Sequence, residues 1–365
     1  MAIEMPKIDV IFQQLAASLI ARSQRGIAIL VIRDGTDDTW NIKKYASQPE
    51  AIADSKLFTE QNLQYIKDTT KWAPYLTYVV RIGAEDTLDA ALTLIEKNIK
   101  TGWITVAAGT ADDWAALVSW IKAKEQRQQY YRAAVFQANA PDNKHVVNLS
   151  NNTVTFADSR GKVTASEWLP SLIGILACCN IQRGCTNYLC SDLIAVEEVE
   201  DNDKAVGEGK FILYNADVDE VRIAQGINSL TTTNGLTLTE DMKFVETVEA
   251  MDLIADDIRR TFREEYLGNY RNKLDNQMLF IGAVNGYLRD LAKPTTAVLD
   301  DEYDNVCQID VDEQRAAWIA AGKTEAATWT DDEVRAMAFK RDVFIWCDVK
   351  ILGSMTNLRF LVNMF

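Results

Sequence analysis

Apolar residues in the first part of the chain gather in short runs that alternate with stretches of helical periodicity. The runs have the length and branched composition of buried strands, and they cover residues 27–32, 76–82, 103–107 and 133–137. Between them, apolar positions recur every three or four residues over 57–67, 87–97 and 112–125. Strands and helices in turn indicate crossover units, so we predict an α/β fold with a mostly parallel sheet covered by helices.

The segments that follow are less regular. Residues 146–156 are apolar on either side of Asn151-Asn152, which favours a hairpin that turns at these asparagines. Residues 166–178 have helical spacing, and Pro170 fits a helix only in its first turn. Residues 211–214 and 221–224 are then two apolar runs around a polar break, a pattern typical of a second hairpin.

Helical periods dominate after this second hairpin. The predicted helices cover residues 244–262, 274–288, 311–321 and 331–340. Thr237 and Glu240 have the spacing of a capping box ahead of the first of them. These elements predict a C-terminal α+β subdomain.

Both ends of the chain have the alternation of extended strands. At the start, the apolar positions are Ile8, Val10 and Phe12. Near the end, two further strands are predicted on either side of Gly353-Ser354, with apolar positions at Val343, Ile345, Val349, Leu358, Phe360 and Val362. Chain ends are normally polar and frayed, so an apolar strand that reaches the last residue needs a partner. That partner is either another strand of the same subunit or the sheet edge of a neighbouring one.

Composition narrows the class of protein. The 365 residues are 48% hydrophobic and carry a net charge of −15. A strongly acidic chain is unsuited to binding nucleic acid, which needs clustered lysine and arginine. No apolar run is long enough to cross a membrane, and the start of the sequence lacks the pattern of a signal peptide. We therefore expect a protein made in a cytoplasm, without nucleic acid or direct membrane insertion.

The sequence contains few candidate catalytic or metal-binding residues. Four of the six cysteines lie between Cys178 and Cys190, but they lack zinc-knuckle spacing, and thiols in apolar segments usually pack as small hydrophobic groups. The single histidine, His145, follows Asp142 in a polar turn that leads into a strand, where a surface or strand histidine is expected rather than part of a catalytic triad. Phosphate-binding glycine loops and the GxSxG elbow are absent from the sequence. We predict no catalytic residue, metal site or cofactor; the alternative is an α/β enzyme of hydrolase or nucleotide-binding type.

Three stretches carry a family resemblance. They are Gly-Lys-Phe-Ile-Leu-Tyr at 209–214, Val-Arg-Ile-Ala-Gln-Gly-Ile-Asn-Ser-Leu-Thr-Thr at 221–232, and the opening 34 residues with their Arg-Ser-Gln-Arg-Gly turn. Together they resemble contractile phage tail sheath proteins, in particular the short sheaths of Gram-positive myophages, defective prophages and R-type bacteriocins. Residues 34–208 match that family in pattern only.

The resemblance implies a domain plan and a function. It divides the chain into an N-terminal linking arm (1–22), an α/β body with a subtilisin-like resemblance (23–208), a C-terminal sheath core domain (209–340) and a C-terminal β-arm (341–365). It implies a structural subunit that polymerises as stacked hexameric rings around a tail tube and contracts. The implied partners are other copies of the chain, the tail tube protein, and baseplate and tail terminator proteins, all within a virion or phage-tail-like particle.

The resemblance also assigns site residues. In sheaths of this kind the arms interlace with neighbouring subunits, which would make the apolar positions of the terminal strands inter-subunit contacts. The helix before the C-terminal arm would face the tube, with Arg335, Lys340 and Arg341 as its basic groups.

Overall fold

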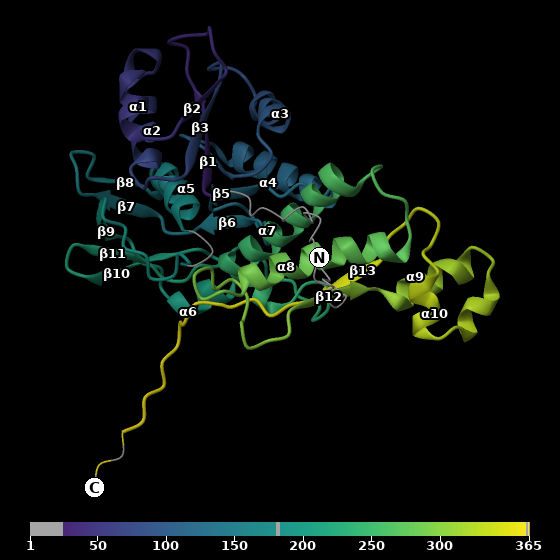
Figure 1. Cartoon of the computed structure of the whole chain (residues 1–365). Helices are drawn as coiled ribbons and strands as arrows, with labels where there is room; N and C mark the ends of the chain where they lie inside the picture. Colours follow the sequence, from purple (N-terminus) through teal and green to yellow (C-terminus); the bar gives the residue numbers. More distant parts are fainter. Residues whose placement is uncertain (1–24, 180–182, 363, 365) are drawn as a thin grey trace, which may run out of the picture. The chain divides into compact units, whose positions relative to one another are not determined.

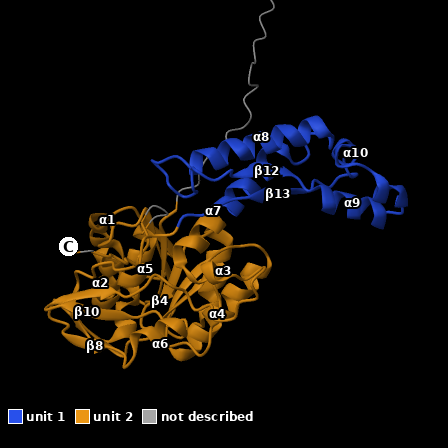
Figure 2. Cartoon of the chain, turned by 90° about the horizontal axis from the view of Figure 1, so that it is seen from below, with its two compact units in different colours: residues 1–23, 253–352 blue, residues 24–252, 353–365 orange. Residues whose placement is uncertain are grey.

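The computed structural model describes residues 25–179, 183–362 and 364. The chain divides into two compact units, one formed by residues 24–252 and 353–365 and the other by residues 1–23 and 253–352 (Figure 2). The predicted arm at Ile8, Val10 and Phe12 lies outside the described residues. The predicted boundary between residues 208 and 209 stays a prediction.

The larger unit is built on a six-stranded sheet in the order β2-β3-β1-β4-β5-β6 (Figure 1). Its strands are β1 (Ile27–Arg33), β2 (Ile42–Tyr45), β3 (Leu76–Ile82), β4 (Trp103–Val106), β5 (Arg132–Phe136) and β6 (Val146–Leu149). All neighbours are parallel except β2, which pairs antiparallel with β3 at one edge. The predicted mostly parallel α/β sheet is therefore confirmed.

Helices cover this sheet in two pairs. Helices α2 (Glu60–Thr70) and α5 (Leu169–Cys178) pack against each other and against β1, while α3 (Leu88–Asn98) and α4 (Ala111–Gln126) pack against each other and against β3 and β5, respectively. A short helix α1 (Gln48–Ala53) packs against α2. The apolar side chains that β1 and α5 contribute are almost fully buried, which explains their uniformly apolar sequences.

The predicted hairpin at residues 146–156 is wrong. β6 joins the main sheet, whereas β7 (Thr153–Phe156) belongs to a separate antiparallel sheet with β8 (Lys162–Thr164) and β9 (Leu193–Val196). The reason is Asn151, whose side-chain amide donates to the carbonyl oxygens of Glu197 and Leu213 and accepts from the Leu213 amide. Asn151 thus ties three segments together instead of forming a turn.

The second predicted hairpin is present with shifted bounds. β10 (Leu213–Asp217) and β11 (Glu220–Ile223) pair antiparallel, and the turn lies at Val218-Asp219. Asp219 has a φ of 57°, which the left-handed position of such a tight turn requires. The residues expected to form the break, 215–217, are part of β10 instead. A short helix α6 (Asn202–Gly207) precedes the hairpin.

Two helices follow close to their predicted positions, but the capping box predicted ahead of the first one is not formed. Helix α7 (Val245–Thr261) contains the point where the two units divide, and α8 (Leu274–Leu291) follows in the smaller unit. The predicted capping box is wrong, because Glu240 begins a separate 3-10 turn and accepts a hydrogen bond from Thr233, while Thr237 accepts one from Asn234.

The rest of the smaller unit centres on a two-stranded antiparallel sheet. The strands are β12 (Val306–Ile309) and β13 (Ile345–Asp348). In the sequence, the helices α9 (Val311–Ala320) and α10 (Asp331–Ala336) lie between them. Strand β12 also packs against α8. The second C-terminal strand, predicted from residue 355 onward, is not formed within this single chain, where residues 354–362 and 364 make no strand pairing.

Candidate assembly interface

The C-terminal segment, residues 354–362 and 364, exposes its apolar side chains. Leu358 is 89% exposed, Phe360 79% and Val362 61%. Monomeric soluble proteins rarely present large apolar side chains as a contiguous group, and such groups commonly mark interaction sites. The predicted arm positions in this segment therefore lie in the open, available to a second molecule.

The beginning of the C-terminal segment is fixed by one carboxylate. The Ser354 amide donates to Glu246 Oε1 at 2.7 Å, and its hydroxyl donates to Glu246 Oε2 at 2.6 Å. Glu246 lies in the first turn of α7. Both oxygens of one side chain thus hold the start of the segment against α7.

The sheet of β12 and β13 has two different edges. At the β12 edge, the Asn285 side chain accepts from the Cys307 amide at 2.6 Å and donates to the Cys307 carbonyl oxygen at 3.0 Å. A side chain therefore occupies the place that a further strand would take at this position. Asn285 belongs to α8, so the helix itself covers the edge.

The β13 edge has no such cover among the described strands. Since the backbone groups of Cys307 bond to Asn285, Cys307 and the opposite Cys347 form a non-hydrogen-bonded pair of the ladder. By the same alternation, the backbone groups of Ile345 and Cys347 point away from β12. The sheet order gives β13 one strand partner within the described ranges, so this edge matches the geometry that strand addition uses.

The structure separates the predicted arm residues into two groups. Ile345 belongs to β13 and pairs with Ile309 of the same chain, and Val343 and Val349 flank that strand half-buried. Leu358, Phe360 and Val362 lie instead in the exposed segment. The first group thus lies in or beside a paired strand, and the second lies in a segment without strand pairing among the described residues.

The predicted tube-facing residues are not on one helix. Helix α10 ends at Ala336, so Lys340, which was predicted to lie within the helix, and Arg341 are both exposed in the turn that follows. Arg335 is on α10, where its guanidinium donates to Asp332 at 2.8 Å. The first turn of α10 is acidic, so the basic groups are displayed beside acidic ones.

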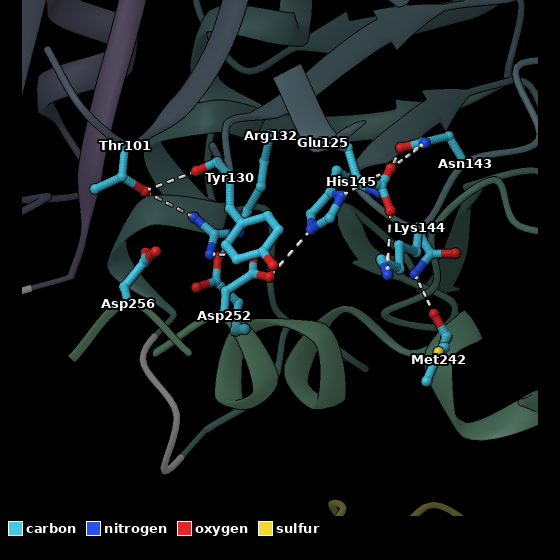
Figure 3. Close-up of polar contacts among 12 residues, drawn as sticks. Thr101, Glu125, Tyr130, Arg132, Asn143, Lys144, His145, Met242, Asp252 and Asp256 are labelled. Atoms are coloured by element: carbon cyan, nitrogen blue, oxygen red, sulfur yellow. Dashed lines mark hydrogen bonds and ion pairs between the residues drawn. The ribbon is translucent and has the colours of Figure 1, made fainter. Parts of the chain in front are cut away.

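A buried ionic cluster in the larger unit was missed from the sequence. His145 is 1% exposed rather than at the surface, and its ring lies between two carboxylates (Figure 3). Nε2 is 3.1 Å from Asp252 Oδ1 and Nδ1 is 3.3 Å from Glu125 Oε2. Arg132 completes the cluster with ion pairs to Asp252 at 2.7 Å and to Glu249 at 2.9 Å. These residues are far apart in the sequence, so no local sequence motif predicts the cluster.

The cluster favours charged side chains throughout. Burial lowers the pKa of His145, but Asp252 and Glu125 outweigh it, so that the pKa is raised above its usual value. Burial acts against the charge of Glu125, yet His145, Asn143 and Lys144 lower its pKa to about 2. Both nitrogens of His145 face carboxylates rather than a serine hydroxyl, so the cluster has the form of a structural clamp on α7 and not of a hydrolase triad.

The other candidate metal-binding and catalytic side chains are either scattered over the structure or hydrogen-bonded within it. The described residues contain no group of three or more acidic, histidine or cysteine side chains placed to hold a metal ion. Asp142 accepts hydrogen bonds from Thr231 and Thr232, which hold its pKa well below the usual range. Across the same described ranges, no helix combines the length and apolar character needed to cross a bilayer.

Comparison with known proteins identifies the C-terminal part. Residues 237–365 match the family model of the phage tail sheath C-terminal domain. The chain carries a tail sheath domain. A tail sheath protein of Clostridium phage phiCD119 extends the sheath resemblance, with 24% identity over 362 residues that make up 98% of each chain. The predicted resemblance to contractile tail sheath proteins is confirmed.

Solved sheath structures share the fold of this sheath-domain chain. The helical sheath of the anti-feeding prophage in its contracted state has a TM-score of 0.71 at 11% identity, over 99% of both chains. The sheath tail protein of Listeria innocua has a TM-score of 0.65 at 13% identity, over 92% of this chain and 97% of that one. Taken with the family match and the curated relative, this shared fold supports a structural role in the sheath of a contractile injection system.

Proposed function

We propose that the chain polymerises as stacked hexameric rings around a tail tube, and that the sleeve contracts from a metastable extended state to drive the tube through a cell envelope. The observation that carries the proposal is the exposed apolar C-terminal segment, in a chain that also has a β13 edge with no strand partner among the described residues. Baseplate and tail terminator proteins would bind the ends of the sleeve. Assembly in a bacterial cytoplasm belongs to the same proposal.

The proposed link between subunits is strand addition. Residues 355–362 of one copy would pair with the β13 edge of the next, where the backbone groups of Ile345 and Cys347 point outward. Main-chain hydrogen bonds would supply affinity, and alternating side chains would fix the register. The N-terminal arm, with Ile8, Val10 and Phe12, would take a second edge in the same way. Main-chain pairing suits this chain because it does not depend on charge, and copies with a net charge of −15 repel one another.

The link is tested by changing one face of the segment at a time. The triple variant Leu358→Asp, Phe360→Asp and Val362→Asp should remain a folded monomer by circular dichroism, because these side chains touch little of their own subunit. It should form no sleeves in negative-stain images. The control carries Asn357→Asp and Arg359→Asp on the opposite face and should still polymerise. Sleeves of ordinary length from the triple variant would reject strand addition by this segment.

The proposed contact with the tube uses Arg335, Lys340 and Arg341. Lys340 and Arg341 are exposed and Arg335 is half-buried, and they come from α10 and from the turn before β13. Single exposed ion pairs contribute about 1 kcal/mol or less, so a tube would be held by repetition along the sleeve. Replacing all three by Glu should abolish co-sedimentation with preformed tubes but leave spontaneous sleeves. Unchanged co-sedimentation would refute the contact.

The proposed contraction draws on contacts between subunit bodies. Arginines on and after α7 already have partners in their own chain, since Arg259 pairs with Asp256, Arg260 with Asp257 and Arg263 with Glu264. Charge pairing between bodies would therefore exchange such partners and should be sensitive to salt, because salt screens exposed pairs. We expect the ratio of extended to contracted sleeves to shift between 0.05 and about 1 M salt. An unchanged ratio would favour apolar burial as the driving contact.

A further inference from the structure

Two cysteines of the smaller unit face each other across its sheet. In the register of β12 and β13, Cys307 lies directly opposite Cys347. The two strands run side by side in Figure 1. Opposite residues of an antiparallel pair project to the same face, so both thiols lie on one side of the sheet. They are free thiols in this structure.

The ladder position is one that accepts a disulfide. The hydrogen bonds from Asn285 to the Cys307 backbone make this a non-hydrogen-bonded pair, in which opposite side chains come closest. Such pairs have Cα atoms about 4.5 Å apart, within the range of roughly 4.4–6.8 Å that disulfides span. The Cα separation typical of this ladder position is therefore compatible with a disulfide.

The two thiols differ in their surroundings. Cys307 is 1% exposed, whereas Cys347 is half-buried and reachable from solvent. Interaction between the two thiols lowers the pKa of Cys347 and raises that of Cys307. The accessible sulfur is thus the one stabilised as the thiolate, the form that attacks disulfides.

We propose that Cys307 and Cys347 form a reversible cross-strand disulfide when the protein meets a small-molecule disulfide. The Cys347 thiolate attacks one sulfur of the small disulfide, forms a mixed disulfide and releases one small thiolate. The Cys307 sulfur then loses its proton to solvent, attacks Cys347 Sγ and displaces the second small thiolate. The two protein thiols are oxidised by two electrons, the small disulfide is reduced to two thiols, and the exchange reverses with excess thiol.

The disulfide would join the two ends of a long segment of the chain. The residues between the two cysteines include α9 and α10, so the disulfide would hold the strands from which both helices project. The outward backbone groups of Cys347 are not consumed, and the β13 edge stays open to a further strand. Oxidation would thus stabilise the smaller unit without blocking that edge.

The other cysteines offer a contrast. Burial raises the pKa of Cys179 to about 12, and it raises the pKa values of Cys185 and Cys190 well above their usual range. Attack on a small disulfide from solution needs an accessible thiolate, which these three thiols do not supply. Cys307 is also buried, but its target in the second step is the sulfur of Cys347, the residue opposite it in the ladder. We therefore expect these three cysteines to resist oxidation, whereas the strand register brings Cys307 and Cys347 together.

The test is peptide mapping of the full-length chain after incubation with oxidised glutathione near pH 8. The expected map has a single cross-linked species, joining the peptides that contain Cys307 and Cys347, with the other cysteines alkylated as free thiols. The thermal midpoint should rise by about 5 °C, from the loop of about 40 residues that the bond closes, and excess dithiothreitol should reverse the rise.

Single variants test the order of attack. Cys307→Ala should accumulate a glutathione adduct at Cys347, Cys347→Ala should gain neither an adduct nor the midpoint shift, and the control Cys190→Ala should keep the cross-link. A native chain that retains all its thiols, or that cross-links other cysteines, would overturn the proposal. The peptide map of the unaltered chain identifies the paired cysteines without any variant. The proposal therefore stays testable if a variant fails to fold.

Discussion

The clamp around His145 makes a quantitative prediction about pH. His145 has its pKa raised in the folded chain, whereas an unfolded histidine titrates near 6.5. The stabilisation is therefore fully present below about pH 6.5 and is lost as pH rises toward the folded-state pKa. In that window the folded chain binds up to one proton more than the unfolded chain, so the free energy of unfolding should fall with rising pH, by at most about 1.4 kcal/mol per pH unit.

The groups that face His145 support this sign. Asp252 approaches from α7 and Glu125 from α4, and both favour the imidazolium form. Arg132 on β5 opposes it, but Arg132 is itself paired with Asp252 and Glu249. Tyr130 stacks on the imidazole with ring centroids 5.5 Å apart. The two carboxylates have lowered pKa values and stay ionised through this window, so His145 is the member of the cluster that titrates.

The assay is urea unfolding, followed by circular dichroism at half-unit steps from pH 6.0 to 8.5. His145→Gln should remove the slope, since glutamine does not titrate. Lys144→Gln is the matched control, because Lys144 is the adjacent residue and also pairs with Glu125, at 3.1 Å, yet leaves the imidazole in place. It should retain the slope. Parallel pH profiles for the wild-type chain and His145→Gln would show that the histidine is not held as a cation.

Four further substitutions, in two matched pairs, test packing and charge by the same unfolding assay. Asp252→Asn should cost about 3–5 kcal/mol, because it removes one partner of a buried charge cluster, while the exposed Glu240→Gln should change stability little. Gly174→Ala should cost about 1–3 kcal/mol, since its methyl group would overlap the Thr69 carbonyl oxygen where α5 crosses α2. Gly282→Ala on α8 meets nothing within 4 Å and should stabilise the chain by about 0.5–1 kcal/mol. Equal effects of the two glycine changes would contradict the packing argument.

Hydrophobic periodicity predicted the regular elements well, because it reports burial directly. Strand β3 has the predicted bounds, and α4 extends the predicted helix by one residue at each end. The errors fall where a polar side chain decides the local structure. The sequence predicted a turn at Asn151, but its side chain binds the backbone of two distant segments. It predicted a helix cap at Glu240, but this residue begins a separate 3-10 turn.

The candidate sites show the same limit. Alternation of apolar residues predicted β13, where the backbone pairs within the chain. It also marked the residues after Gly353, where the side chains have no apolar surface of their own subunit to cover them. A single sequence does not distinguish these cases, since both satisfy the same alternation. The partners of His145 were missed for a related reason, because Glu125 and Asp252 reach it only through the tertiary fold.

The division between permanent and reversible contacts follows from where the chain places its apolar and charged groups. Strand addition by the C-terminal segment would combine main-chain hydrogen bonds with burial of Leu358, Phe360 and Val362, neither of which salt screens. The arginines on and after α7 meet acidic partners at the surface, where individual pairs are weak and exchangeable. The anchor of Ser354 on Glu246 would then transmit a movement of the body to the arm without breaking the strand pairing. Under the proposed function, a subunit built in this way would keep its neighbours through the arms while its charged faces exchanged partners.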